Sequence, residues 1–269
     1  MTLRLIATDL DGALLDSTGM VTPRTRRALD AARARGIHVV PVTARQPIGL
    51  RAIAAEAGFD GWALCGNGAY ATNLVDGRML FAEELPPETI RTLAQALRAS
   101  IPGLLFASVR EGGETFVAED GYAEIADYSD HKRHPQTMGG VPLDQVLAAP
   151  TLKLVIRHPE FAPTVLFETL RDLGLTGFEA TLSGAPFVEV MAEGVTKATG
   201  LARLCEHLDV PQSDVVAFGD ALNDVERLRW AGRGVAMAGA DDVVRDAADE
   251  VAASNDDDGV ARVIERMLG

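Results

Sequence analysis

Close to its start the chain carries an apolar run, Leu3–Ala7, that leads into Asp9-Leu10-Asp11-Gly12. Side chains two residues apart share one face of a strand, and two acids on an exposed face would normally be solvated. At the carboxyl end of a central parallel strand, however, Gly12 permits a sharp turn and both acids can face one crevice. Two such acids repel each other unless a cation lies between them. The tetrapeptide therefore predicts either a Mg²⁺ site or an ordinary Asp-Gly turn.

Composition limits the possible partners. The 269 residues, 47% of them hydrophobic, suffice for one large or two medium domains with their own cores. A formal net charge of −14 disfavours nucleic acids and anionic membranes as partners, but a lysine and a metal ion can still create a local site for a small anion. Cys65 and Cys205 lack metal-ligand spacing, and buried free thiols are expected. With no signal peptide and no apolar run of about 18 residues, we expect a cytoplasmic protein.

The order of apolar and helical patterns predicts an α/β fold with an insertion. Strands and helices alternate at both ends of the chain, which indicates a parallel sheet with right-handed crossovers. Between 84 and 186 the pattern changes to an α+β insertion with antiparallel strands. We therefore expect a core of 1–83 and 187–269 and an inserted domain of 84–186. The expected strands are 3–8, 37–42, 62–65, 104–109, 115–118, 153–157, 178–182, 187–191, 215–218 and 234–237; the expected helices are 23–35 with Thr22 as N-cap, 46–57, 86–100, 162–173, 196–208, 223–230, 241–248 and 260–268.

Polar residues recur where the core strands end or the helices begin, which is where open α/β sheets bind ligands. Thr43 follows the second strand, and Lys197 lies in a first helical turn, where a cation is unfavourable for the helix dipole. Gly219-Asp220-Ala221-Leu222-Asn223-Asp224 follows a later strand. Taken singly, each also fits a turn, a surface lysine or a helix cap.

In combination these segments resemble the haloacid dehalogenase-like phosphatases, and more narrowly their Cof-type, sugar-phosphatase-like branch. The resemblance covers nearly the whole chain and implies a Rossmann-like core with an inserted α+β cap. The matching segments are Asp9-Leu10-Asp11-Gly12-Ala13-Leu14-Leu15, Thr43-Ala44-Arg45, Gly66-Asn67-Gly68-Ala69, Gly194-Val195-Thr196-Lys197, Gly219-Asp220-Ala221-Leu222-Asn223-Asp224 and Asp258-Gly259-Val260-Ala261.

The resemblance also implies roles for individual residues. Asp9 is expected to be the nucleophile that takes up the phosphoryl group, and Asp11 the general acid and then the general base. The remaining site residues divide into two groups. Phosphate binding is implied for Thr43, Ala44, Lys197 and Asn223. Mg²⁺ binding is implied for Asp9, Asp220, Asp224 and the backbone carbonyl of Asp11, with Asp224 orienting either Lys197 or a metal-bound water.

The sequence departs from the branch at two positions, because Ala13 stands where Thr is usual and Ala44 where Gly is usual. Both carboxylates remain, so we expect a slower or shifted enzyme. The expected reaction is Mg²⁺-dependent hydrolysis of a small phosphorylated metabolite, either a sugar phosphate or a cofactor such as pyridoxal phosphate or flavin mononucleotide. A phosphomutase and a catalytically silent phosphate-binding protein are the alternatives. The sequence leaves the oligomeric state and the exact substrate open.

Overall fold

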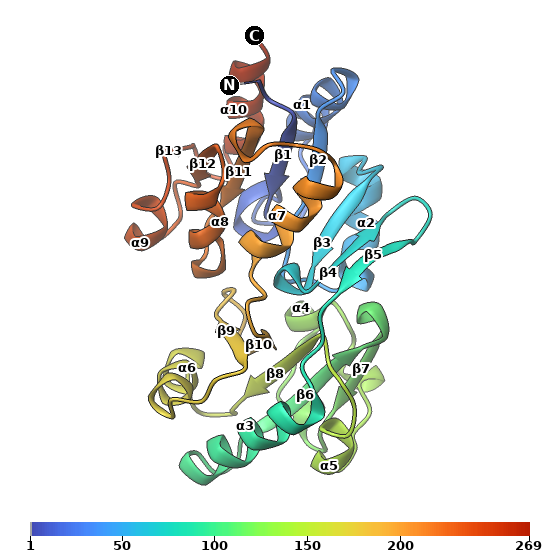
Figure 1. Ribbon diagram of the computed structural model, residues 1–269, viewed down its shortest axis with the longest axis vertical. Coiled ribbons are helices and arrows are strands. Elements are labelled where there is room, and N and C mark those ends of the chain that lie inside the picture. The colour runs from blue at the N-terminus through green and yellow to red at the C-terminus, as the bar shows by residue number, and fades with distance from the viewer. Residues whose placement is uncertain (1) are drawn as a thin grey trace. The chain divides into compact units, whose positions relative to one another are not determined.

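The computed structural model describes residues 2–269, which form two compact units (Figure 1). The first unit comprises residues 2–44, 50–81 and 196–269, and the second comprises 45–49 and 82–195. Each unit has its own sheets and its own core. The sequence analysis expected a core of 1–83 and 187–269 and an insertion of 84–186, whereas the second unit of the structure also includes residues 45–49 and extends to 195.

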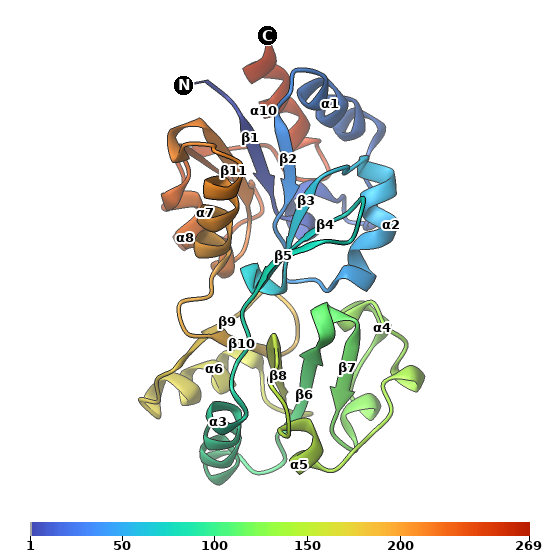
Figure 2. The same ribbon diagram turned by 45° about the vertical axis from the view of Figure 1, so that its right-hand side comes forward.

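The first unit is built on a parallel sheet in which β1 (Leu5–Thr8) lies between β11 and β2 (Figure 2). Every residue of β1 and β11 is buried, as expected for strands covered on both faces. Leu5 and Ala7 share a core cluster with Leu201 and Leu204 of helix α7. The other strands are β11 (Val215–Gly219), β2 (His38–Pro41), β12 (Arg233–Ala236) and β13 (Glu250–Val251).

The helices of the first unit follow the expected starts and stops. Helix α1 (Pro23–Ala34) begins after Thr22, whose side chain accepts a hydrogen bond from the Thr25 amide. Helix α1 packs against α10, and α7 packs against α8. Helix α9 is four residues long, shorter than expected. The further helices are α2 (Pro47–Ala57), whose first residues fall in the second unit, α7 (Lys197–His207), α8 (Val225–Trp230), α9 (Asp242–Arg245) and α10 (Gly259–Leu268).

The third expected strand of the parallel sheet pairs differently. Strand β3 (Trp62–Cys65) runs antiparallel to β4 (Tyr70–Asn73) and belongs to a separate sheet with β5 (Met79–Ala82). A single parallel bridge, Val42 to Leu64, links it to the end of β2. The turn at 66–68 explains the difference, because it sends the chain directly back along β3, and such a short connection joins antiparallel strands.

The second unit is an antiparallel sheet of order β7-β6-β8-β10-β9. Strand β6 pairs antiparallel with β7, and β9 with β10, in agreement with the antiparallel strands expected for the insertion. Helices α3 and α6 pack on one face through a cluster that includes Leu93, Leu97 and Leu166. The elements are α3 (Pro87–Ser100), β6 (Leu105–Arg110), β7 (Thr115–Ala118), α4 (Tyr128–His131), α5 (Leu143–Val146), β8 (Lys153–Arg157), α6 (Pro163–Asp172), β9 (Phe178–Thr181) and β10 (Val188–Ala192).

The second boundary of the insertion falls after β10, at Thr196, and not at residue 187. Strand β10 pairs with both β8 and β9, so hydrogen bonding places it in the second unit. Cys65 and Cys205 are buried free thiols, as expected. Across residues 2–269, the structure contains no helix with the length and apolar character needed to span a bilayer.

Candidate active site

Three adjacent parallel strands of the first unit end beside one another. In the register of the sheet, Thr8 of β1 is opposite Phe218 of β11 and Pro41 of β2. The sheet continues one step further on the β11 side, where the Asp9 amide donates to the Phe218 carbonyl at 3.0 Å. Asp9 and Asp220 therefore follow neighbouring strands at the same edge, and Thr43 follows the third.

A tight turn over residues 10–14 sets the direction of the chain after Asp9. The Leu14 amide donates to the Asp9 carbonyl at 3.3 Å, and the Leu15 amide donates to the Leu10 carbonyl at 2.9 Å. Gly12 has φ +77°, and a Cβ at this position would lie 2.1 Å from Oδ2 of Asp220. Glycine is therefore needed both for the backbone angle and for the close approach of the Asp220 carboxylate. Asp11, between Leu10 and Gly12, is exposed.

Lys197 is the first residue of α7 and only 1% exposed. Its Nζ lies 3.0 Å from Oδ1 of Asp9 and 2.8 Å from Oδ1 of Asp224. Burial by itself lowers the pKa of the Lys197 ammonium, but Asp224 and Asp9 outweigh burial and raise that pKa above its usual value. A buried lysine is tolerated because it is paired in this way. The structure thus brings Lys197 to the Asp9 carboxylate, as the sequence predicts.

The Asp224 carboxylate is completely buried and accepts four hydrogen bonds. Oδ1 accepts from Lys197 and from Nη2 of Arg227, which is 2.6 Å away. Oδ2 accepts from the backbone amides of Asp220 and Ala221 at 3.1 and 3.3 Å. Burial acts to raise the pKa of Asp224, but the charges of Lys197 and Arg227 and these hydrogen bonds lower it overall. Asp224 is therefore a fixed anion.

Gly219, just before Asp220, provides the space that Asp224 occupies. A Cβ on Gly219 would lie 2.5 Å from Cβ and Cγ of Asp224. Any side chain at Gly219 would displace Asp224 and, with it, the salt bridge to Lys197.

The carboxylates of Asp9, Asp220 and Asp224 form a compact acidic group, with one oxygen from each lying within 4.8 Å of the other two. Oδ1 of Asp220 is buried and accepts no hydrogen bond among residues 2–269. Burial, followed by the charges of Asp9 and Asp224, raises the pKa of Asp220 to about 7. Burial also raises the pKa of Asp9 to about 6, although Lys197 opposes the shift. Oxygen ligands with raised proton affinity and an unsatisfied buried oxygen fit a hard divalent cation such as Mg²⁺.

A second polar chain connects the ends of β11 and β2. Nδ2 of Asn223 donates to Oδ1 of Asn67 at 2.9 Å, and the Asn67 amide donates to the Thr43 carbonyl at 3.0 Å. Thr43 is 1% exposed, and Ala44 is partly exposed. The structure therefore links Asn223 to Thr43 through Asn67, for which the sequence analysis assigned no role.

Arg227 also contacts the site, and the sequence analysis assigned it no role either. It lies in α8, has no exposed surface, and forms an ion pair with Asp224 three residues earlier. The spacing of an acid and a base at i and i+3 was the available signal. The sequence pattern predicts only a helix over residues 223–230.

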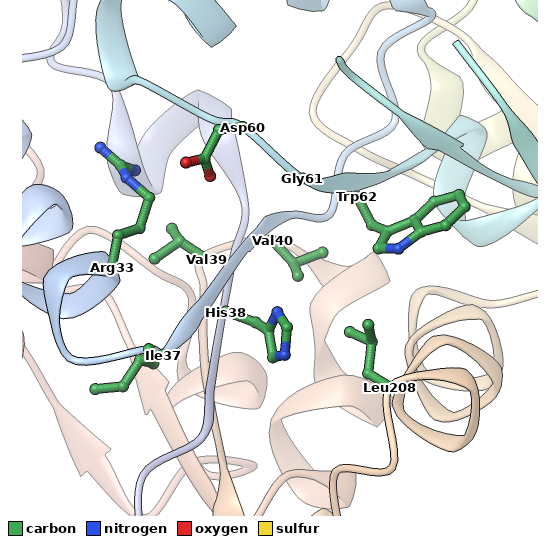
Figure 3. Close-up of a pocket in the computed structure, with 10 residues that line it drawn as sticks. Arg33, Ile37, His38, Val39, Val40, Asp60, Gly61, Trp62 and Leu208 are labelled. Carbon is green, nitrogen blue, oxygen red and sulfur yellow. The ribbon is translucent and has the colours of Figure 1, made fainter. Parts of the chain in front are cut away.

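A separate pocket of about 210 Å³ opens at the amino ends of β2 and β3, away from the strand ends that carry the acids (Figure 3). Its lining includes Arg33, His38, Asp60, Trp62 and Leu208. Figure 3 shows Arg33 and Asp60 on one side of β2 and Trp62 and Leu208 on the other. None of the acids of the candidate active site lines this pocket.

Comparisons with known proteins agree on one family. A family model described as haloacid dehalogenase-like hydrolase matches residues 6–264. The pyridoxal phosphate phosphatase YbhA of Escherichia coli is 30% identical, covering 98% of each chain. The 5-amino-6-(5-phospho-D-ribitylamino)uracil phosphatase YcsE of Bacillus subtilis is 28% identical, covering 99% of this chain and 96% of that protein. A haloacid dehalogenase-like hydrolase from Bacteroides thetaiotaomicron superposes with a TM-score of 0.79 at 29% identity, covering 99% of this chain and all of the other.

Proposed function

The chain belongs to the haloacid dehalogenase-like hydrolases and is a phosphatase of that family, and from this premise we propose a Mg²⁺-dependent reaction through an aspartyl phosphate. The observation that supports the proposal most directly is the close approach of the Asp9 carboxylate, the Lys197 ammonium and the unsatisfied Asp220 oxygen. The proposed nucleophile, the proposed cation for phosphoryl oxygens and the proposed metal ligand thus lie close together near the ends of β1 and β11.

In the first step, a carboxylate oxygen of Asp9 attacks the phosphorus atom and the bond to the ester oxygen breaks. Asp11 donates a proton to that leaving oxygen, so the product is a neutral alcohol. Lys197 stabilises the negative charge on the transferring phosphoryl group, because its Nζ is already 3.0 Å from the attacking carboxylate.

In the second step, Asp11 removes a proton from a water molecule, and the water oxygen attacks the phosphorus of the acyl phosphate. The bond to Asp9 breaks, inorganic phosphate leaves, and the Asp9 carboxylate is regenerated. Asp11 suits both steps, since its side chain is exposed and lies outside the compact acidic group. Thr43, the Ala44 backbone and Asn223 complete the proposed phosphate-binding set.

Mg²⁺ would bind Asp9, Asp220 and the backbone carbonyl of Asp11, and when bound it offsets the repulsion between the Asp9 carboxylate and the phosphoryl oxygens. Asp224 belongs to the same acidic group. Because both of its oxygens already accept hydrogen bonds, we assign it to orienting Lys197 and to the charge of the site.

We propose a small phosphate monoester as substrate, on a sugar, a sugar alcohol or a cofactor, because the two relatives are named for pyridoxal phosphate and for a phosphorylated ribitylamino compound. The test is phosphate release from a panel that includes glucose 6-phosphate, pyridoxal phosphate and flavin mononucleotide. Mg²⁺ should restore activity to the chelated protein better than Ca²⁺, whose looser coordination misplaces the nucleophile. Hydrolysis of the whole panel in a chelator, or of none of it with Mg²⁺, would refute the proposal.

A further inference from the structure

The largest side chain that is fully buried among residues 2–269 is that of Arg227. Its Nη2 donates to Oδ1 of Asp224 at 2.6 Å and to the carbonyl of Phe218 at 2.7 Å. The same Phe218 carbonyl accepts the amide hydrogen of Asp9 at 3.0 Å. One guanidinium nitrogen therefore joins the backbone that carries the nucleophile to the carboxylate that holds Lys197.

Stability alone is a poor explanation for this residue. Nε and Nη1 of Arg227 are buried without a hydrogen-bond partner in the described part of the chain, which carries a desolvation cost. Replacing a buried ion pair by apolar residues of similar volume is often neutral or stabilising. An arginine at this position is thus costly for the fold, and the benefit must be sought in the site that it contacts.

The geometry points to a positioning role: we propose that Arg227 holds Asp224 in place and balances its charge, which leaves the Lys197 ammonium available to Asp9 and to the phosphoryl group. Lys197 Nζ lies between two carboxylates, at 2.8 Å from Asp224 and 3.0 Å from Asp9. Without Arg227, the fully buried Asp224 would have Lys197 as its main counter-charge and would draw the ammonium away from Asp9. This inference rests on the proposed phosphatase function.

The charge of the cluster supports the same role. Asp9, Asp220 and Asp224 contribute three carboxylates, while Lys197 and Arg227 contribute two cations. Removing Arg227 would add one net negative charge to a buried site that must accept a phosphate dianion. The effect should be greatest in the transition state, in which Asp9 approaches the phosphorus most closely.

The test compares Arg227→Met, Arg227→Lys and Arg227→Gln in the full-length protein with Mg²⁺. For Arg227→Met we expect kcat to fall about 10- to 100-fold, the range of one to two charge-assisted hydrogen bonds, with a much smaller change in KM. Inhibition by vanadate, which mimics the transition state, should weaken more than inhibition by inorganic phosphate. Arg227→Lys should recover part of the loss because it restores the charge, whereas Arg227→Gln should not.

The control is Leu29→Ala, which removes a buried side chain of α1 and should lower the melting temperature without changing kcat of the folded protein. If Arg227→Met does not fold, the kcat values of Arg227→Lys and Arg227→Gln are compared instead to test the positioning role. Equal kcat in those two variants, or wild-type kcat in folded Arg227→Met, would overturn the positioning role while leaving the phosphatase proposal intact. A wild-type protein that hydrolyses no phosphate ester would instead overturn the proposed function and this inference with it.

Discussion

Both units bury charged side chains, and they do so with different charge balance. In the second unit, Lys153 of β8 pairs with Glu189 of β10, with the two side chains 4% and 1% exposed. In the first unit, Lys197 and Arg227 lie among three carboxylates. The first cluster is therefore one positive charge short, whereas the Lys153–Glu189 pair is neutral.

Burial shifts the pKa values of ionisable groups at both clusters toward their neutral forms. In the first unit, the pKa of Asp9 rises to about 6 and that of Asp220 to about 7, chiefly through burial. In the second unit, burial and then the charge of Lys153 lower the pKa of His131 to about 3, so this histidine stays neutral. It stacks on Phe187 and contacts the Tyr122 hydroxyl at 2.8 Å. We infer that the acidic surplus marks a site for an added cation, and that the balanced pair belongs to the packing of the second unit and takes no part in catalysis.

The strongest test of this contrast is Asp9→Asn. The amide cannot form the acyl phosphate, so phosphate release should fall by at least about 10⁴-fold, toward the background rate. Steady-state phosphate release and circular dichroism would be measured together, since the fold should be unchanged. An Asp9→Asn protein with ordinary turnover would show that the surplus acids are not the reaction centre.

A smaller loss is expected for Asp11→Asn, at about 10²–10⁴-fold in kcat, which is typical for removal of an acid–base group. The loss should be larger for an alkyl phosphate than for p-nitrophenyl phosphate, whose leaving group needs no proton. Comparison of the two substrates gives the measurement. An equal loss of kcat/KM on both substrates would exclude Asp11 as the acid in the first step, because kcat/KM does not include the later hydrolysis of the acyl phosphate.

For the Lys153–Glu189 pair we expect substitution to change stability and not activity. Lys153→Met removes the cation that pairs with the buried Glu189 carboxylate and should cost about 3–5 kcal/mol of unfolding free energy, measured by urea denaturation. The double variant Lys153→Met, Glu189→Leu should recover much of that stability, and kcat of the folded protein should stay near the wild-type value in both. A selective loss of kcat without a loss of stability would place this pair in catalysis.

The change in melting temperature that Mg²⁺ causes should depend on pH, by a few degrees, because of the acids in the first unit. Asp9 and Asp220 have pKa values raised in the folded protein, so the metal-free protein gains stability from their protonation at low pH. That stability is lost as the pH rises through about 6 to 7, where Mg²⁺ can replace the protons. The increase in melting temperature caused by Mg²⁺ should therefore be larger at about pH 8 than at about pH 5. An increase independent of pH would mean that the metal binds elsewhere.

Much of the first unit could be predicted from the sequence. The apolar runs before Asp9 and Asp220 are fully buried strands, and parallel strands bring their carboxyl ends to one edge. Lys197 stood out because a cation in a first helical turn opposes the helix dipole. These signals are local in the sequence, and for that reason they could be recognised without knowledge of the fold.

The rest depended on contacts between distant segments. The pairing of β3 with β4 follows from the turn at 66–68, whose left-handed Asn67 the sequence does not reveal. In the sequence, Arg227 looks like any other arginine of a helix. Its contact with Asp224 depends on Gly219, which lacks a side chain and so leaves space for the Asp224 carboxylate. The sequence analysis placed β10 in the core. Its place in the second unit depends on pairing with β8 and β9, which its own residues do not reveal.

The central claim is that Asp9 takes up the phosphoryl group. The direct measurement is rapid acid quenching of the protein during turnover with Mg²⁺, followed by mass spectrometry of its peptides. We expect a phosphoryl group on the peptide that contains Asp9, removable by hydroxylamine and absent in Asp9→Asn. Turnover that releases phosphate while the Asp9 peptide never gains a phosphoryl group would contradict it.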